Sequence, residues 1–373
     1  MESGLLESWP ENGPKLVWIH RDGGLGYSSN AVVDDRLYTM GLRGDAEFVI
    51  ALDVKDGHEV WSTEIGPLFT NGWGNGPRST PTIHEGRVYA LGAAGDIVCL
   101  QADDGKLVWR RTMADFGGST PDWGYVESPL VEATRVMLTP GGPNGAVVAL
   151  NRDTGELLWQ SKQFIDGAQY SSIIAVENHG VSQYVQRTME SVVGLSLNGT
   201  VLWHVEYAGR TAMIPTPIYR DGRVYVAAGY GVGCMMTEID KDQKASQVYA
   251  NKVMKNHHGG VVLVGDHLYG YSDGYGWTCQ AFDSGELVWN EKEALGKGSV
   301  CYADGRLYCL TESGDVALLE ATPKGYVEHG RFRLDPQTQQ RHPRGAIWSH
   351  PVVANGKLYL RDQDLILCYD IKD

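Results

Sequence analysis

The chain has 373 residues and a formal net charge of −14 at pH 7. This charge argues against nucleic acid as a partner, because binding to phosphates needs clustered Lys and Arg. A membrane-spanning helix needs about 18 or more consecutive apolar residues, and the chain has no such run, so we expect no membrane span.

One sequence pattern recurs along the chain about every 45 residues. It is clearest at residues 147–159, VVALNRDTGELLW, where it ends in a tryptophan. Other copies end at Trp61, Trp109, Trp203 and Trp289, and two degenerate copies carry Tyr249 and His329 in the tryptophan position. A period in the forties is typical of β-propeller blades and of some helical repeats.

The pattern inside each unit favours strands. A second segment precedes each copy, as in PTIHEGRVYALG (81–92) and PIYRDGRVYVAAG (217–229), where apolar runs flank Glu-Gly or Asp-Gly. Such runs are typical of tight β-hairpins, and no segment keeps the i, i+3, i+4, i+7 spacing of a helix. Each unit is therefore predicted to contain two hairpins, which makes four antiparallel strands.

Eight such units fill the chain, with innermost strands beginning near residues 28, 79, 127, 171, 215, 259, 298 and 349. The last unit stops at Asp373 before its fourth strand, and PKLVWIH (14–20) carries the missing pattern near the start. We predict an all-β fold, an eight-bladed β-propeller of four-stranded antiparallel blades, in which the N-terminal strand closes the last blade. Residues 1–373 are then expected to form a single domain.

The repeat resembles that of the PQQ-like β-propeller family, which includes the quinoprotein alcohol dehydrogenases and the BamB-like proteins. The resemblance rests on the motif Ala-x-Asp-x-x-Thr-Gly-x-x-x-Trp, present at residues 149–159 with Asn151 in the Asp position and recurring in phase. It implies that the repeated tryptophans pack between blades. A repeat of this kind specifies a fold and leaves the function open.

The cysteines point to buried thiols. Cys99, Cys279 and Cys368 occupy the same core position in different blades, too far apart for a disulfide, which needs Cα atoms within about 7 Å. No C-x-x-C motif is present, so neither zinc nor haem is supported.

Connections between propeller strands fall on two faces. Short turns such as Glu85-Gly86 and Thr154-Gly155 are expected on one face. If the four strands of a blade are lettered A to D from the innermost outward, the B–C and D–A connections fall on the other face, around the mouth of the central channel. Long connections are expected there, such as GPLFTNGWGNGPR (66–78) and DPQTQQRHPRGAIW (335–348). Loops on a rigid scaffold carry function, so this mouth is the predicted site.

Two columns of equivalent positions open the innermost strands. The first is mostly Ser or Thr, which indicates a structural ring of hydroxyls: Ser29, Thr80, Ser128, Ser172, Thr216, Gly260, Ser299 and His350. The second, two residues earlier, changes from blade to blade, which is typical of a lined binding site: Tyr27, Arg78, Val126, Tyr170, Ile214, His258, Lys297 and Trp348. Ring geometry should point this second column toward one axis, where Arg78 and Lys297 would make the site positive.

We predict a ligand-binding set at this mouth, comprising Arg78, Glu127, Tyr170, His258, Lys297, Trp348, His350, Trp123, Tyr230 and Trp277. Aromatic faces with carboxylates, Arg and His suit a polar, ring-shaped ligand such as a sugar. His257 and His258, in the segment NHHGGVV, are the candidate catalytic acid or base. We expect no metal site, because neither a carboxylate nor a third histidine is adjacent to them in sequence.

Three functions stay open at the level of sequence. The first is binding of a small polar or anionic ligand, such as a carbohydrate, at the channel mouth, with or without catalysis. The second is a non-catalytic, BamB-like scaffold for a protein partner. The third is an alcohol or sugar dehydrogenase that uses PQQ with calcium; the chain lacks the adjacent Cys-Cys pair and the long insertions of those enzymes, so we expect no cofactor.

The beginning of the chain bears on location. MESGLLESWP lacks the basic and apolar segments of a signal peptide, and it is similar to the region that follows a secretion signal in the family. We expect a periplasmic or extracellular protein if a signal peptide has been removed, and otherwise a cytoplasmic one. We also expect a monomer.

Overall fold

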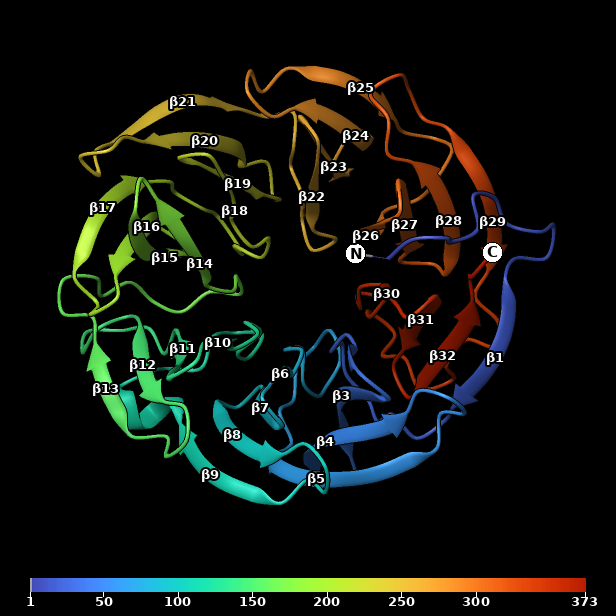
Figure 1. Cartoon of the computed structure of the whole chain (residues 1–373), viewed down its shortest axis with the longest axis horizontal. Helices are drawn as coiled ribbons and strands as arrows, with labels where there is room; N and C mark the ends of the chain where they lie inside the picture. Colours follow the sequence, from blue (N-terminus) through green and yellow to red (C-terminus); the bar gives the residue numbers. More distant parts are fainter. Residues whose placement is uncertain (1) are drawn as a thin grey trace.

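Eight β-sheets surround a central axis in the computed structural model, which describes residues 2–373 (Figure 1). Each sheet has four antiparallel strands, as the hairpin pattern predicts, so the eight-bladed propeller is confirmed. Within the described chain, the 3-10 turn η1 (Met113–Phe116) is the one helical element, and no helix is long and apolar enough to cross a membrane.

Strands A to D of each blade run from the channel to the rim. Blades one to four comprise β2 (Ala31–Val33), β3 (Arg36–Arg43), β4 (Ala46–Asp53) and β5 (Glu59–Pro67); β6 (Thr82–His84), β7 (Arg87–Leu91), β8 (Asp96–Gln101) and β9 (Leu107–Thr112); β10 (Leu130–Val131), β11 (Arg135–Leu138), β12 (Val148–Asn151) and β13 (Leu157–Gln160); and β14 (Ile174–Asn178), β15 (Val181–Arg187), β16 (Ser191–Ser196) and β17 (Val201–Glu206).

Blades five to eight continue around the ring. They comprise β18 (Ile218–Arg220), β19 (Arg223–Ala228), β20 (Gly233–Ile239) and β21 (Ala245–Asn251); β22 (Val261–Val264), β23 (His267–Ser272), β24 (Gly276–Ala281) and β25 (Leu287–Glu291); β26 (Gly298–Ala303), β27 (Arg306–Thr311), β28 (Asp315–Glu320) and β29 (Glu328–Arg333); and β30 (Val352–Ala354), β31 (Lys357–Asp362), β32 (Leu365–Asp370) and β1 (Lys15–His20).

The A–B hairpins follow directly from their turn residues. Glu85 and Gly86 both have positive φ (44° and 72°), as do Asp221 and Gly222 (49° and 81°). Two successive residues with positive φ form a two-residue turn whose twist matches the twist of the two flanking strands. This geometry fixes the register of strands A and B in these blades.

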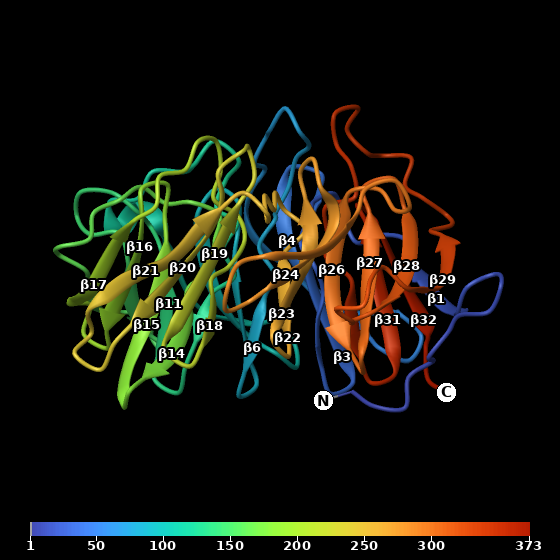
Figure 2. The same ribbon diagram turned by 90° about the horizontal axis from the view of Figure 1, so that it is seen from above.

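The two faces of the ring differ in their connections (Figure 2). The long segments are the D–A connections, such as residues 68–81 (blue) and 334–351 (red), which project from one face. Most B–C connections on that face are short, such as residues 273–275, so the expectation that both kinds would be long was wrong for these turns. The functional face is thus built mainly from D–A connections.

A repeated tryptophan contact joins one blade to the next. The indole N–H of Trp61 donates to the carbonyl of Ala102 (2.9 Å), and that of Trp109 donates to the carbonyl of Arg152 (2.8 Å). Each acceptor lies in the C–D turn of the following blade. Equivalent bonds from Trp18, Trp159 and Trp289 repeat the contact, so the implied packing between blades is confirmed for these residues.

Trp203 departs from this pattern. Its indole N–H donates to Gln183 of its own blade (2.6 Å), and the Gln183 amide donates to Gln243 (2.9 Å) in the C–D turn of blade five. A glutamine pair therefore transmits the contact at this junction. In the equivalent turns of other blades a glycine packs under the indole ring, as Gly105 does under Trp61.

The N-terminal strand closes the ring, as predicted. β1 pairs with β32 from Lys15↔Asp370 to His20↔Ile366, which completes blade eight. Arg361 of β31 is fully buried and donates to the carbonyls of Ser28 and Gly24 in blade one (3.0 Å each). The first and last blades are therefore joined by the N-terminal strand, which completes blade eight and leads into blade one, and by a buried arginine.

Trp9 supplies an aromatic ring that blade seven lacks, because this blade has His329 in the tryptophan position. The ring centroids of Trp9 and Tyr308 are 6.1 Å apart, with 51° between the ring planes. The repeat tryptophan of blade one makes nearly the same contact, since Trp61 and Tyr38 are 5.9 Å apart with 52° between their planes. Trp9 is 7% exposed and also contacts Phe332 (5.2 Å). The segment before β1 therefore completes the core of blade seven.

The cysteine prediction is confirmed. Cys99, Cys279 and Cys368 are free and buried on the third strands of blades two, six and eight. Burial raises the pKa of the Cys99 thiol to about 11, so it stays protonated and unreactive at neutral pH.

Trp9→Ala should destabilise the fold strongly. Truncation of a buried tryptophan costs about 3–5 kcal/mol, and here it removes the ring that packs on Tyr308 and Phe332 of blade seven. Urea denaturation should give a lower midpoint than for Trp73→Ala, a control that removes a tryptophan with 43% exposure. Equal midpoints for the two variants would show that Trp9 does not hold blade seven.

Candidate functional site

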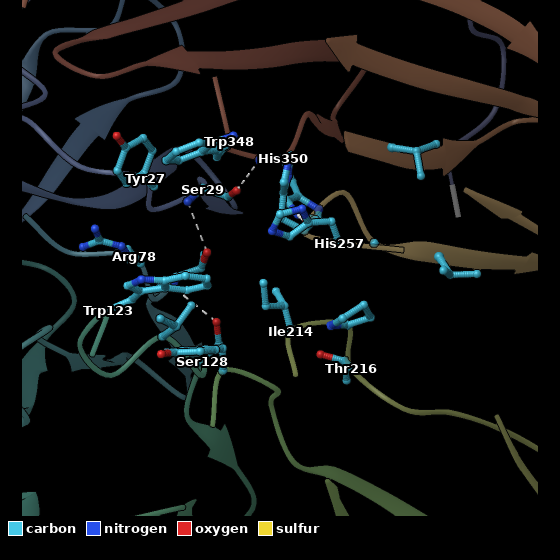
Figure 3. A pocket seen from close by; sticks show the side chains of 18 of the residues that line it. Tyr27, Ser29, Arg78, Trp123, Ser128, Ile214, Thr216, His257, Trp348 and His350 are labelled. Atoms are coloured by element: carbon cyan, nitrogen blue, oxygen red, sulfur yellow. Dashed lines mark hydrogen bonds between the residues drawn. The ribbon is translucent and has the colours of Figure 1, made fainter. Parts of the chain in front are cut away.

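A cavity of about 550 Å³ lies at the mouth of the channel on the long-loop face (Figure 3). Its walls include every residue of the variable column except Lys297: Tyr27, Arg78, Val126, Tyr170, Ile214, His258 and Trp348. His257, His350, Trp123 and Tyr230 line it as well. Side chains from different blades thus converge where the repeat alignment placed them.

A ring of hydroxyl groups supports one side of the cavity. The backbone N–H of His350 donates to Ser29 Oγ (2.8 Å), and that of Ser29 donates to Thr80 Oγ1 (3.2 Å). The series continues from Thr80 to Ser128 (3.1 Å) and from Ser128 to Ser172 (2.9 Å). Each hydroxyl caps the first strand of the neighbouring blade, which is the structural role expected from the Ser/Thr column.

The ring changes where blade six carries Gly260. The imidazole of His350 lies against Gly260, where an added Cβ would come within 3.1 Å of it. From there His350 Nε2–H donates to the carbonyl of His258 (2.9 Å). Burial lowers the pKa of His350, so this side chain is a neutral crosslink from blade eight to blade six rather than a free base.

Aromatic side chains form much of the wall. Trp123 and Tyr170 are stacked with ring centroids 5.2 Å apart and 19° between the planes. Tyr27 lies 5.0 Å from Trp348, and Trp73 lies 6.4 Å from Trp348 at the rim. Such faces suit the apolar side of a ring-shaped ligand.

Arg78 is held by its own loop. Its guanidinium donates to the carbonyls of Gly74 and Gly76 (2.8 Å each) and lies 5.2 Å from the Tyr27 ring. Burial lowers the pKa of Arg78. Arg78 therefore shapes the 68–81 connection as well as the cavity wall.

Lys297 lies behind the wall. Its ammonium donates to His257 Nδ1 (2.8 Å) and to Asp273 Oδ1 (2.9 Å). Burial and the Lys297 charge lower the pKa of His257 to about 4. Of the two cations expected to make the site positive, Lys297 is therefore paired with Asp273 behind the wall, and Arg78 is the one that lines the cavity.

Glu312 is a cavity residue that the sequence analysis missed. Its Oε1 accepts bonds from His258 Nε2–H (2.8 Å) and from the Trp348 indole (2.9 Å). Burial opposes ionisation, but these bonds outweigh it and lower the pKa of Glu312 to about 2. Glu312 opens a B–C turn, and a comparison of B–C turn positions between blades would have drawn attention to it.

Glu127 and Trp277 do not line the cavity, contrary to expectation. Glu127 lies between the wall residues Val126 and Ser128. Because side chains alternate along an extended chain, Glu127 points into the blade. There its carboxyl group accepts hydrogen bonds from the N–H and the Oγ1–H of Thr139. Trp277 is 1% exposed and donates to the carbonyl of Gly296 (3.0 Å), which fixes the connection that carries Lys297.

The cavity residues do not fit PQQ held with calcium. Calcium takes roughly six to eight oxygen ligands, and Glu312 is the one carboxylate in the cavity lining. Within residues 2–373 the one cluster with metal-ligand spacing is Asp53, Asp56 and His58, in a C–D turn of blade one outside that lining. PQQ thus stays an alternative from the sequence resemblance alone.

Comparisons with known proteins show the family. The PQQ_2 family model, described as outer membrane protein assembly factor BamB, matches residues 45–281. Among relatives, BamB of Burkholderia pseudomallei is 28% identical over 195 residues, which is 42% of this chain and 48% of that protein. BamB of Escherichia coli is 25% identical over 368 residues, covering 82% of this chain and 86% of that protein.

Solved structures share the fold. BamB from Moraxella catarrhalis superposes with a TM-score of 0.67 at 14% identity, over 92% of this chain and 94% of that one. Quinohemoprotein alcohol dehydrogenase from Comamonas testosteroni gives 0.66 at 12% identity, over 96% and 76%. At these identities the likeness concerns the fold alone.

Glu127→Gln should flatten the pH dependence of stability. Burial raises the pKa of Glu127 from 4.5 to about 8 in the folded protein, so between these values the folded state binds a proton that the unfolded state has lost. The free energy of unfolding then falls with rising pH by up to about 1.4 kcal/mol per unit.

Urea denaturation at pH 5 and at pH 8 checks this. The fall in stability between the two pH values should be smaller in Glu127→Gln than in the parent protein. An unchanged fall would mean that Glu127 is ionised in the folded state.

Proposed function

This chain is a PQQ-like repeat propeller that belongs to the family described as outer membrane protein assembly factor BamB, and from that premise we propose that it works as a scaffold for a protein partner. The relatives are named for the assembly of outer membrane proteins. We extend to this chain a role in binding other proteins on the periplasmic side. The partner surface is the long-loop face.

The observation that carries this proposal is an exposed tryptophan and arginine at the cavity rim. The Arg344 guanidinium lies 5.5 Å from the ring centroid of Trp73, and the two residues come from different D–A connections. Trp73 is 43% exposed. Trp and Arg are the residues most enriched at the energetic centres of protein interfaces, and an apolar cavity beside them can take a side chain of the partner.

Photocrosslinking tests the scaffold role. p-Benzoylphenylalanine at position 344 should crosslink a defined protein in an extract of the source organism. Trp73→Ala should remove most of that crosslink, because truncating an interface tryptophan commonly costs about 2 kcal/mol or more. The matched control places the photoprobe at Glu85, in the A–B turn on the opposite face. A crosslink that is equally strong from Glu85, or one that does not depend on Trp73, would contradict the proposal.

Binding of a small ligand at the channel mouth is the second candidate. The specific observation in its favour is the cavity itself, whose volume lies in the usual range of roughly 300–1,000 Å³ for ligand sites. Aromatic walls with a few polar groups suit a sugar or another polar ring. The two candidates can be tested separately, since the scaffold role rests on Trp73 and Arg344 at the rim and ligand binding rests on the residues inside the cavity.

A thermal-shift screen tests this second candidate. The panel contains neutral sugars, uronic acids, and PQQ with calcium. A binder present at about 100 times its Kd should stabilise the fold by about 2.7 kcal/mol and raise the Tm. No shift with any compound at millimolar concentration would leave the scaffold role as the whole proposed function, and a shift with PQQ and calcium would revive the dehydrogenase alternative.

A further inference from the structure

A continuous chain of hydrogen bonds runs along one wall of the cavity. The Tyr230 hydroxyl meets His257 Nε2 (2.5 Å), His257 Nδ1 meets the Lys297 ammonium (2.8 Å), and Lys297 donates to Asp273 Oδ1 (2.9 Å). Tyr230 and His257 face the cavity, whereas Lys297 and Asp273 lie behind them. These four residues come from connections of blades five, six and seven, and the fold brings them together.

The direction of these bonds follows from the chemistry of the groups. An ammonium can only donate, so His257 Nδ1 accepts from Lys297. His257 has a pKa of about 4 and is neutral, so its one proton is on Nε2 and is donated to the Tyr230 oxygen. The Tyr230 proton is then free to be donated into the cavity, and the bonds behind it strengthen this donor.

Tyr230 adopts a costly backbone conformation. Its φ is 55°, in the left-handed region that bulky residues avoid. Such a conformation is unfavourable for a bulky side chain and persists only where the surroundings impose it. Here the turn between β19 and β20 places the phenol against His257, with 4.3 Å between the ring centroids.

Glu312 supplies an acceptor in the same cavity. Its Oε1 is occupied by His258 and Trp348, while Oε2 has no hydrogen-bond partner within residues 2–373. The cavity therefore offers one polarised donor, one carboxylate acceptor, and the stacked faces of Trp123 and Tyr170.

The charges favour a neutral ligand. Asp273 neutralises Lys297, and the Arg78 guanidinium is already bonded to two backbone carbonyls. The lining then holds one cation, Arg78, and one carboxylate, Glu312, so a ligand with an extra carboxylate would gain little net attraction and would approach the Glu312 carboxylate. Neutral rings with hydroxyl groups on their edge and C–H groups on their faces match this set of partners.

We propose that this cavity binds a neutral sugar ring, with the Tyr230 hydroxyl as hydrogen-bond donor and Glu312 as acceptor. His257, Lys297 and Asp273 are positioning residues that hold Tyr230 as a donor. The assignment rests on the second candidate function, a small ligand at the channel mouth, and names the class of that ligand.

Isothermal titration calorimetry on the full chain tests the assignment. The probes are glucose, galactose, mannose and xylose and their methyl glycosides, with glucuronate and galacturonate as anionic matches. At least one neutral probe should bind, and more tightly than its uronate. Tyr230→Phe and Glu312→Gln should each weaken that binding at least tenfold, whereas Tyr302→Phe and Glu85→Gln, both exposed and outside the cavity lining, should leave it unchanged.

The positioning role has its own readout. In protein labelled with 15N-histidine, His257 should show the neutral Nε2–H form between pH 5 and pH 8. Lys297→Met should change its nitrogen shifts and weaken sugar binding, and Lys297→Arg should restore part of both. An unchanged His257 spectrum in Lys297→Met would contradict the proposal that Lys297 positions His257 and, through it, Tyr230.

Other outcomes overturn the assignment of the ligand. These are the absence of binding by any neutral probe, preference for the uronates, or unchanged affinity in Tyr230→Phe. The scaffold role stands or falls separately, because crosslinking from position 344 does not involve Tyr230. Sugar binding without a partner crosslink would remove the scaffold role only, and the reverse result would remove the sugar site only.

Discussion

The contact between the tryptophan of one blade and the C–D turn of the next is the interaction on which the rest of the structure depends. The turn must carry a residue without a side chain, because a Cβ on Gly105 would come within 2.5 Å of the Trp61 ring. Gly105 also has a positive φ of 70°, a backbone conformation that glycine adopts without a steric clash and that other residues avoid. One pair of residues thus sets the spacing between blades, and its repetition closes a ring.

The seam shows how closure is achieved when the repeats differ. Trp18 of the last blade lies over Gly57 of the first, so the junction between blades eight and one repeats the common contact. Blade seven has no tryptophan of its own at this position, and Trp9 from outside the repeats packs on Tyr308 instead. Stability and closure are therefore properties of the same N-terminal segment.

A rigid ring leaves the mouth of the channel free to vary. In four blades the hydroxyl column repeats because Ser29, Thr80, Ser128 and Ser172 each accept a backbone N–H from the neighbouring blade. At Gly260 the column is interrupted, His350 crosses to blade six, and the groups that face the cavity become Tyr230, His257 and Glu312. The departures from the repeat are concentrated on this side of the ring, as expected where selection acts on binding rather than on folding.

Much of this arrangement could be predicted from the sequence because the repeat allows residues to be compared by position. Alignment of the repeats, with the alternation of side chains along each strand, located the variable column. The count of blades showed that the last one lacked a strand, which led to the N-terminal segment. Glu127 was misplaced because loop residues were pooled without applying the alternation that turns it into the blade. Trp9 precedes the first repeat, so no comparison by position reached it.

The charges could not be predicted in this way. Whether Lys297 faces the cavity or is paired behind it depends on Asp273, which lies in the B–C turn of another blade. Glu312 was missed for a related reason, since its partners His258 and Trp348 come from blades six and eight. Pairing between blades is set by three-dimensional proximity, which a one-dimensional repeat does not encode.

The central claim is that function resides at the channel mouth on the long-loop face. Hydroxyl-radical footprinting of the full chain, with and without its bound partner or sugar, tests it most directly. The account predicts that Trp73, Trp123 and Trp348 lose modification on binding, while Leu287 on outer strand β25 and Tyr302 beside the opposite face keep it. Protection of the outer strands, with the three tryptophans unchanged, would contradict it.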